Sequence, residues 1–138
     1  MQMPSYATLV RSSDTQDFTW TSNTYDTRAL ERPESTTNPP GRIAACWYYG
    51  GQFSLDVTIH DGQLHQVALY FLDWDNYHGR AETITVSDPT TGQILDQRAM
   101  TSFVDGKYLV WRLSGSVSIG IENTNNSSNA VVSGIFFG

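Results

Sequence analysis

The sequence predicts an all-β protein, an antiparallel β-sandwich of the jelly-roll type. Three observations lead to this fold class. Apolar and polar residues alternate with a period of two, strand-like segments recur with turn residues between them, and no segment of helical length is amphipathic. A chain of 138 residues can bury a core without disulfides or metals. We therefore predict a single module over residues 1–138, with a poorly defined N-terminal segment at residues 1–16.

The first strands are expected near residues 18–21 and at residues 42–48. Alternation is clearest in residues 53–59, where Phe, Leu, Val and Ile take the odd positions and Ser, Asp and Thr the even ones. Residues 117–121 repeat this pattern. Because successive side chains of a strand point to opposite faces, such segments bury one face and expose the other.

Two segments, residues 66–72 and 130–137, are apolar on both faces. They are expected to be central strands that are covered on both sides or touch a second layer. Further strands are predicted at residues 82–87, 94–99 and 108–113. The strand-like segments recur roughly every 8–12 residues, which is typical of a sandwich.

The segments between the strands read as turns and loops. Residues 31–41 carry three of the five prolines, and residues 123–129 are almost entirely Asn, Ser and Thr. Glycines that tolerate positive φ follow Asp61, Thr91 and Asp105 and indicate short turns.

Composition narrows the function. The net charge is −6, and the eight Lys and Arg residues are scattered, so we expect neither nucleic acid nor an anionic membrane as a partner. Charged residues make up only 16%, and Ser, Thr, Asn and Gly supply the polarity, as is common in secreted β-proteins. No export signal is visible, so we expect a fragment of a longer secreted protein. The single cysteine, Cys46, cannot form an intrachain disulfide and is expected to be buried.

Four stretches carry a resemblance to a known family: residues 42–48 (RIAACWY), 53–75, 109–111 (LVW) and 129–138. Together they resemble a module that recurs in large secreted bacterial proteins, some of them glycoside hydrolases, including a soil-metagenome endoglucanase. More broadly they are similar to malectin-like and galactose-binding-like β-sandwiches. The resemblance spans about residues 18–138. It implies a β-sandwich carbohydrate-binding module that is tethered to a catalytic domain.

The first candidate site is the run from Asp73 to Arg80, directly after a predicted central strand. Sugar rings stack on flat aromatic side chains, while amides, carboxylates and guanidinium groups bind hydroxyls. We therefore expect a platform of aromatic side chains with polar partners around it, formed by Trp74, Asp75, Asn76, Tyr77, His78 and Arg80. The alternative is structural: Trp74 covers the core, and Arg80 pairs with Asp73 or Asp75.

The second candidate site is the aromatic run Trp47-Tyr48-Tyr49. On a strand, Trp47 and Tyr49 share one face and Tyr48 takes the other. Three large aromatics cannot all enter the core, so Trp47 or Tyr49 is expected to contact sugar. Trp111 is predicted to lie in the core, and so is Trp20, which shares a face with Phe18. A wide sugar platform across one sheet could still include either of them.

Metal binding and catalysis have weaker signals. Asp73 and Asp75, with Asn76 beside them, could supply oxygen ligands to a structural calcium ion, although no full calcium-loop pattern is present. No nucleophile elbow, phosphate loop or metalloprotease motif occurs, so we do not expect an enzyme. Exposed strand edges leave room for a dimer.

The expected function is a secreted, non-catalytic module that binds plant β-glucan, such as cellulose chains or xyloglucan, and targets an attached glycoside hydrolase to it. Two alternatives stay open. One is a structural or adhesion β-sandwich without a sugar site, and the other is a small polysaccharide hydrolase or lyase, which needs two carboxylates about 5–10 Å apart.

Overall fold

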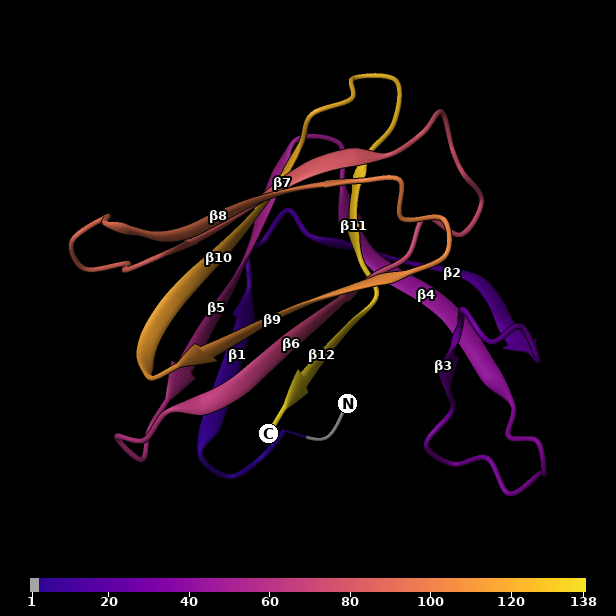
Figure 1. Cartoon of the computed structure of the whole chain (residues 1–138), viewed down its shortest axis with the longest axis horizontal. Coiled ribbons are helices and arrows are strands. Elements are labelled where there is room, and N and C mark those ends of the chain that lie inside the picture. The colour runs from indigo at the N-terminus through magenta and orange to yellow at the C-terminus, as the bar shows by residue number, and fades with distance from the viewer. Residues whose placement is uncertain (1–2) are drawn as a thin grey trace.

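The computed structural model describes residues 3–138, and within them it contains β-strands and no helix (Figure 1). No helix that could cross a membrane is therefore found in this part of the chain. The strands are β1 (Ala7–Arg11), β2 (Gln16–Thr24), β3 (Leu30–Glu31), β4 (Arg42–Tyr49), β5 (Gln52–Ile59), β6 (His65–Phe71), β7 (Ala81–Ser87), β8 (Ile94–Thr101), β9 (Lys107–Leu113), β10 (Gly115–Asn123), β11 (Ala130–Val132) and β12 (Gly134–Phe137).

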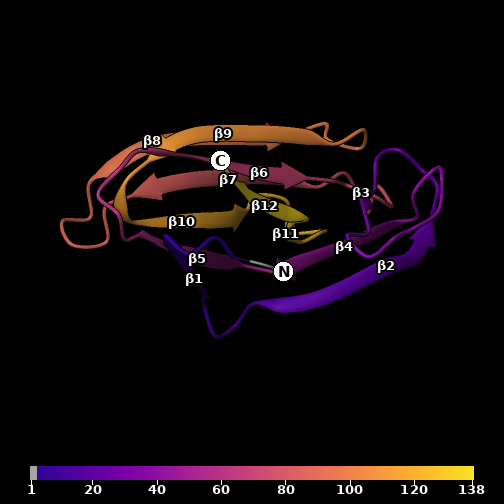
Figure 2. The ribbon, with the colours of Figure 1, turned by 90° about the horizontal axis from the view of Figure 1, so that it is seen from below.

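The strands form three antiparallel sheets. A five-stranded sheet has the order β1-β5-β10-β7-β8, a three-stranded sheet the order β12-β6-β9, and a third sheet the order β11-β4-β2 with β3 paired to β4. Figure 2 shows the three-stranded sheet lying over β5 and β10, and the sheet of β2, β3 and β4 reaching beyond this stack. This arrangement confirms the predicted all-β antiparallel sandwich.

The core lies between the five-stranded and the three-stranded sheet. The apolar odd positions of β5, from Phe53 to Ile59, are buried, as the alternation predicts. The matching positions of β10, from Val117 to Ile121, are buried as well. Val67, Leu69 and Phe71 of β6 face them from the other sheet and are completely buried. Trp111 of β9 joins this core, as predicted, and its indole Nε1–H donates to Asp96 Oδ2 over 2.7 Å.

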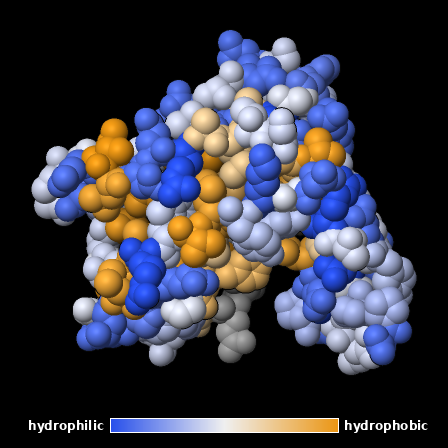
Figure 3. All heavy atoms as spheres, viewed as in Figure 1, coloured by the Kyte–Doolittle hydropathy of each residue, from blue (hydrophilic) through white to orange (hydrophobic). Residues whose placement is uncertain are grey.

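The outer face of the three-stranded sheet is partly apolar. Tyr108, Val110 and Phe136 are exposed there, and the Tyr108 ring lies against the buried Tyr70 at a centroid distance of 4.6 Å. Figure 3 shows this side of the molecule, where hydrophobic residues are mixed with hydrophilic ones.

The single strand predicted at residues 130–137 is two strands in the structure. Ser133 separates β11 from β12, and the two belong to different sheets. At the break, the Ser133 N–H donates to the Tyr70 carbonyl over 2.8 Å. A Cβ on Gly134 would come within 2.8 Å of the end of the Leu30 side chain and 3.1 Å of the Phe136 ring, so a larger residue here would displace these side chains. Alternation of polarity carries no signal for such a change of sheet.

Two strands are not predicted from the sequence. β1 pairs with the edge of the five-stranded sheet through β5, within the segment that the sequence leaves poorly defined. β3 contains two residues only and pairs with β4. Both are too short or too irregular in polarity to show the alternation on which the other predictions depend.

The packing predicts a large loss of stability for Leu69→Ala. Leu69 is completely buried on a central strand, and removing such a side chain leaves a cavity, so we expect the free energy of unfolding to fall by about 3 kcal/mol. Val110→Ala on the neighbouring strand, where the side chain is 49% exposed, should change it by less than about 0.5 kcal/mol. Urea denaturation measures both, and equal effects would contradict the assignment of the core.

Candidate functional site

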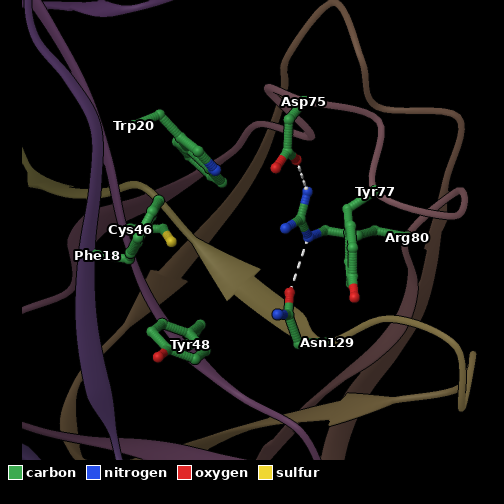
Figure 4. A pocket seen from close by; sticks show the side chains of 8 residues that line it. All are labelled: Phe18, Trp20, Cys46, Tyr48, Asp75, Tyr77, Arg80 and Asn129. Atoms are coloured by element: carbon green, nitrogen blue, oxygen red, sulfur yellow. Dashed lines mark hydrogen bonds and ion pairs between the residues drawn. The ribbon is translucent and has the colours of Figure 1, made fainter.

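A groove of about 260 Å³ lies between one face of strands β2 and β4 and the loop that joins β6 to β7. Figure 4 shows the side chains around it, with aromatic residues from the strands on one side and polar residues from the loops on the other. The groove is lined by Phe18, Trp20, Cys46, Tyr48, Asp75, Tyr77, Arg80 and Asn129. We call it the aromatic groove.

The strand side of the groove results from the pairing of β2 with β4. Phe18 lies opposite Cys46, and Tyr48 follows Cys46 on the same face. The Phe18 ring meets the rings of Trp20 and Tyr48 edge-on, at centroid distances of 6.2 and 6.4 Å. Such T-shaped contacts are favourable for aromatic pairs. The three rings therefore form one continuous apolar surface.

The exposure of this surface corrects the prediction that Trp20 belongs to the core. Phe18 is 51% exposed, and Trp20 is half-buried, packing against the core while lining the groove. The reason is that β2 lies in the sheet that extends beyond the stacked sheets (Figure 2). An apolar face exposed in this way is characteristic of a binding surface.

The opposite side of the groove is organised by Arg80, which is buried. Its Nη1 donates to Asp73 Oδ1 over 2.6 Å and also to Asp75 Oδ1, while its Nε donates to Asn129 Oδ1 over 2.8 Å. Burial by itself lowers the pKa of Arg80. The hydrogen bonds with Asp75 and Asp73 raise this pKa by more than burial lowers it, so the net shift is upward. The guanidinium therefore stays charged in this position.

Arg80 also joins the two sides of the groove. Its Cζ lies 5.4 Å from the centre of the Trp20 ring and 5.7 Å from that of Tyr77. Both distances are within the range of cation–π attraction. The Tyr77 ring is 48% exposed and forms the outer rim of the groove.

The loop that carries Asp75 and Tyr77 is fixed by its neighbour, the polar loop between β10 and β11. Asn125 Nδ2 donates to the carbonyls of His78 and Gly79, both over 2.8 Å. Ser128 Oγ donates to the Tyr77 carbonyl over 2.6 Å. These bonds satisfy the backbone of a tight turn, so the groove is formed before any ligand arrives.

A buried carboxyl lies behind this network. Glu82 Oε1 accepts a hydrogen bond from the Val131 N–H over 2.9 Å, and Oε2 has no partner among the described residues. Burial raises the pKa of Glu82 from its ordinary 4.5 to about 8. The side chain is therefore uncharged at neutral pH.

The residues predicted from the sequence fall into two groups. Asp75, Tyr77 and Arg80 line the groove, whereas Asn76 and His78 are exposed on the same loop outside it. The ion pairs of Arg80, which the sequence leaves open as a structural alternative, are present with both Asp73 and Asp75.

The three remaining candidates lie elsewhere. Trp74 is covered by the guanidinium of Arg28, with Cζ 4.5 Å from the ring centre. Trp47 packs against Arg11 in the same way at 5.0 Å, and Tyr49 is half-buried away from the groove. The residues that sequence reasoning missed are Phe18, Trp20, Tyr48 and Asn129. The only available signal was that Phe18 and Trp20 share a face, which a core strand would also show.

The expected calcium ligands have another role in the structure. The guanidinium of Arg80 donates hydrogen bonds to the carboxylates of both Asp73 and Asp75. Within residues 3–138, no group of three or more His, Cys, Asp or Glu side chains is arranged to hold a metal ion.

No family model matches the sequence, and no curated protein is significantly similar to it. Several solved structures are similar in fold, among them the following three. One is a family 61 carbohydrate-binding module in complex with β-1,4-galactotriose (TM-score 0.46, 11% identity, covering 97% of this chain and 88% of that one). Another is a family 35 carbohydrate-binding module from Clostridium thermocellum (TM-score 0.44, 11% identity, 94% and 95%). The third is an exo-β-1,3-galactanase from Phanerochaete chrysosporium with β-1,3-galactotriose (TM-score 0.44, 18% identity), of which this chain covers 29%.

The buried Glu82 predicts a pH-dependent stability. Its folded-state pKa of about 8 exceeds the ordinary 4.5, so the folded chain keeps a proton that the unfolded chain releases. The stabilisation is complete below the unfolded pKa and is lost as pH rises towards 8. Relative to Glu82→Gln, the wild-type free energy of unfolding should therefore fall by about 4 kcal/mol between pH 5 and pH 8.

Urea denaturation at several pH values measures this difference. The same substitution at the exposed Glu122 on β10 is the control and should leave the pH profile of the wild type unchanged. Parallel profiles for the wild type and Glu82→Gln would show that Glu82 ionises normally.

Proposed function

We propose that this chain is a non-catalytic carbohydrate-binding module and that the aromatic groove is its ligand site. One observation carries the proposal: a preformed groove has an exposed aromatic surface on one side and a charged, hydrogen-bonding surface on the other. A pyranose ring has the same division, with apolar C–H faces and a polar edge of hydroxyls. Aromatic rings bury the faces, and amides, carboxylates and guanidinium groups bind the edge.

The size of the groove fits a short segment of a chain. Its volume of about 260 Å³ is at the lower end of ligand sites. We expect one or two sugar rings to enter and the rest of the polymer to stay outside. Hydroxyls exchange hydrogen bonds with water for bonds with protein at little net gain. Dissociation constants should therefore be micromolar to millimolar, or about −4 to −8 kcal/mol.

The proposed ligand is a β-linked glucan, such as a cellulose chain or xyloglucan. All ring hydroxyls of β-glucose are equatorial, so both faces of each ring are apolar and suit the surface of Phe18, Trp20 and Tyr48. The module would hold an attached, secreted glycoside hydrolase near its substrate and so raise the effective concentration of that enzyme. The low charge content and the resemblance to modules of secreted hydrolases support this context.

The features of the groove favour sugar binding over the two alternatives, a polysaccharide hydrolase or lyase and a structural module. A glycosidase needs two carboxylates at its cleft. Among the described residues that line the groove, only Asp75 has a carboxyl group, and Arg80 binds it. A structural module without a sugar site has no need to bring exposed aromatic side chains together with hydrogen-bonding groups in one groove, as Phe18 and Tyr77 are brought together with Arg80.

Affinity electrophoresis tests the proposal, with β-glucan, xyloglucan, glucomannan, xylan, pectin and β-galactan in the gel. We expect β-glucan or xyloglucan to retard the wild type. Phe18→Ala and Tyr77→Ala should weaken binding at least about tenfold, which corresponds to roughly 1.4 kcal/mol. Both side chains are largely exposed, so these variants should stay folded.

Tyr108→Ala is the matched control, because Tyr108 is an equally exposed tyrosine on the outer face of the three-stranded sheet. Trp47→Ala and Trp74→Ala test the sites predicted from the sequence alone. Because neither side chain lines the groove, both variants should retain binding. If no polysaccharide retards the wild type, the chain is a structural module. If only Trp47→Ala or Trp74→Ala loses binding, the site lies outside the groove.

A further inference from the structure

The polar side of the aromatic groove has three atoms that no residue from 3 to 138 binds. They are Asp75 Oδ2, Arg80 Nη2 and Asn129 Nδ2. Each of these atoms belongs to a side chain that is already held by hydrogen bonds through its remaining polar atoms, so the position of the free atom is fixed. Arg80 Nη2 and Asn129 Nδ2 are not among the buried unpaired atoms of the described residues, which are Glu82 Oε2 and Ser133 Oγ, so both contact solvent. The Asp75 side chain is 43% exposed, and all three residues line the groove.

Figure 4 shows where these atoms point. The free oxygen of Asp75 and the free nitrogen of Arg80 are directed across the groove towards Trp20 and Cys46, and the free amide nitrogen of Asn129 lies below them on the same side. The groove thus presents one acceptor and two donors in a row. A neutral sugar edge matches this row, because a hydroxyl can donate to Asp75 while neighbouring hydroxyl oxygens accept from Arg80 and Asn129.

The charge of the network decides between a neutral and an acidic sugar. Arg80 alone would attract the carboxylate of a uronic acid. Its single positive charge is already shared between Asp73 and Asp75, which together carry two negative charges. The remaining charge at the groove is therefore negative, and it lies on Asp75, beside the free donors of Arg80. An incoming carboxylate would meet a like charge in a partly buried site, where screening is weak.

We propose that Asp75, Arg80 and Asn129 select uncharged sugars and exclude uronic acids, with Asp75 as the residue that determines this specificity. The proposal rests on the function proposed above and deepens it. It identifies the ligand class of the groove as neutral pyranosides with adjacent hydroxyls and gives Asp75 a role that is distinct from the stacking role of the aromatic side chains.

The test compares pairs of ligands that differ only in charge. Isothermal titration calorimetry would measure binding of β-1,4-gluco- and β-1,4-galacto-oligosaccharides and of the same compounds oxidised at C6 to uronates. For the wild type, we expect each neutral ligand that binds to do so at least tenfold more tightly than its oxidised form. Equal or tighter binding of the oxidised form would overturn the proposed selectivity while leaving the sugar-binding function intact.

Asp75→Asn removes the negative charge and retains an oxygen that can accept from Arg80. Asp75 is partly exposed, so the variant should stay folded. We expect the ratio of neutral to oxidised affinity to fall about tenfold. Asp56→Asn makes the same change of net charge at an exposed site on β5 outside the groove, and it should keep the wild-type ratio.

The outcomes separate the two proposals. An unchanged ratio in Asp75→Asn would show that Asp75 does not determine the selectivity. An equal fall in Asp56→Asn would show that only the overall charge matters, which also contradicts the proposal. Failure of every neutral ligand to bind the wild type would overturn the sugar-binding function itself, and the selectivity with it.

Discussion

The guanidinium of Arg80 is the interaction on which the groove depends. It is buried and binds three side chains that come from two different loops: Asp73 and Asp75 before it, and Asn129 directly before β11. A buried charge is tolerated only when its partners are well placed, and removal of one partner of such a pair typically costs 3–5 kcal/mol. The position of the loop between β6 and β7 is therefore determined by the need to compensate one cation.

The location of the groove follows from a change of sheet. At Ser133 the chain passes from β11, which pairs with β4 in the sheet that extends past the sandwich, to β12 in the three-stranded sheet. One face of that extension is covered only at its edge, by the loops that Arg80 links. The result is an apolar strand surface beneath rigid polar loops, which is the usual way in which sandwich folds carry binding sites.

The sequence predicted most of the strands because alternation in polarity is a local property. It placed the buried faces of β5 and β10 correctly and identified Trp111 as core. It also placed Tyr48 opposite Trp47 and Tyr49, as the lining of the groove shows. What it could not indicate was which face of β4 borders a groove, because that depends on the pairing of Phe18 with Cys46, far apart in the sequence. The same limit applies to Asn129, whose role exists only through its contact with Arg80.

The charge of the Arg80 network also depends on the buried carboxyl of Glu82 behind it. If Glu82 were ionised, it would add a third negative charge near Arg80 to those of Asp73 and Asp75. Burial keeps Glu82 protonated, with a pKa of about 8, so that Asp73 and Asp75 alone balance Arg80. The burial of Glu82 thus limits the negative charge near the groove, and Asp75 is the residue that presents this charge to a ligand.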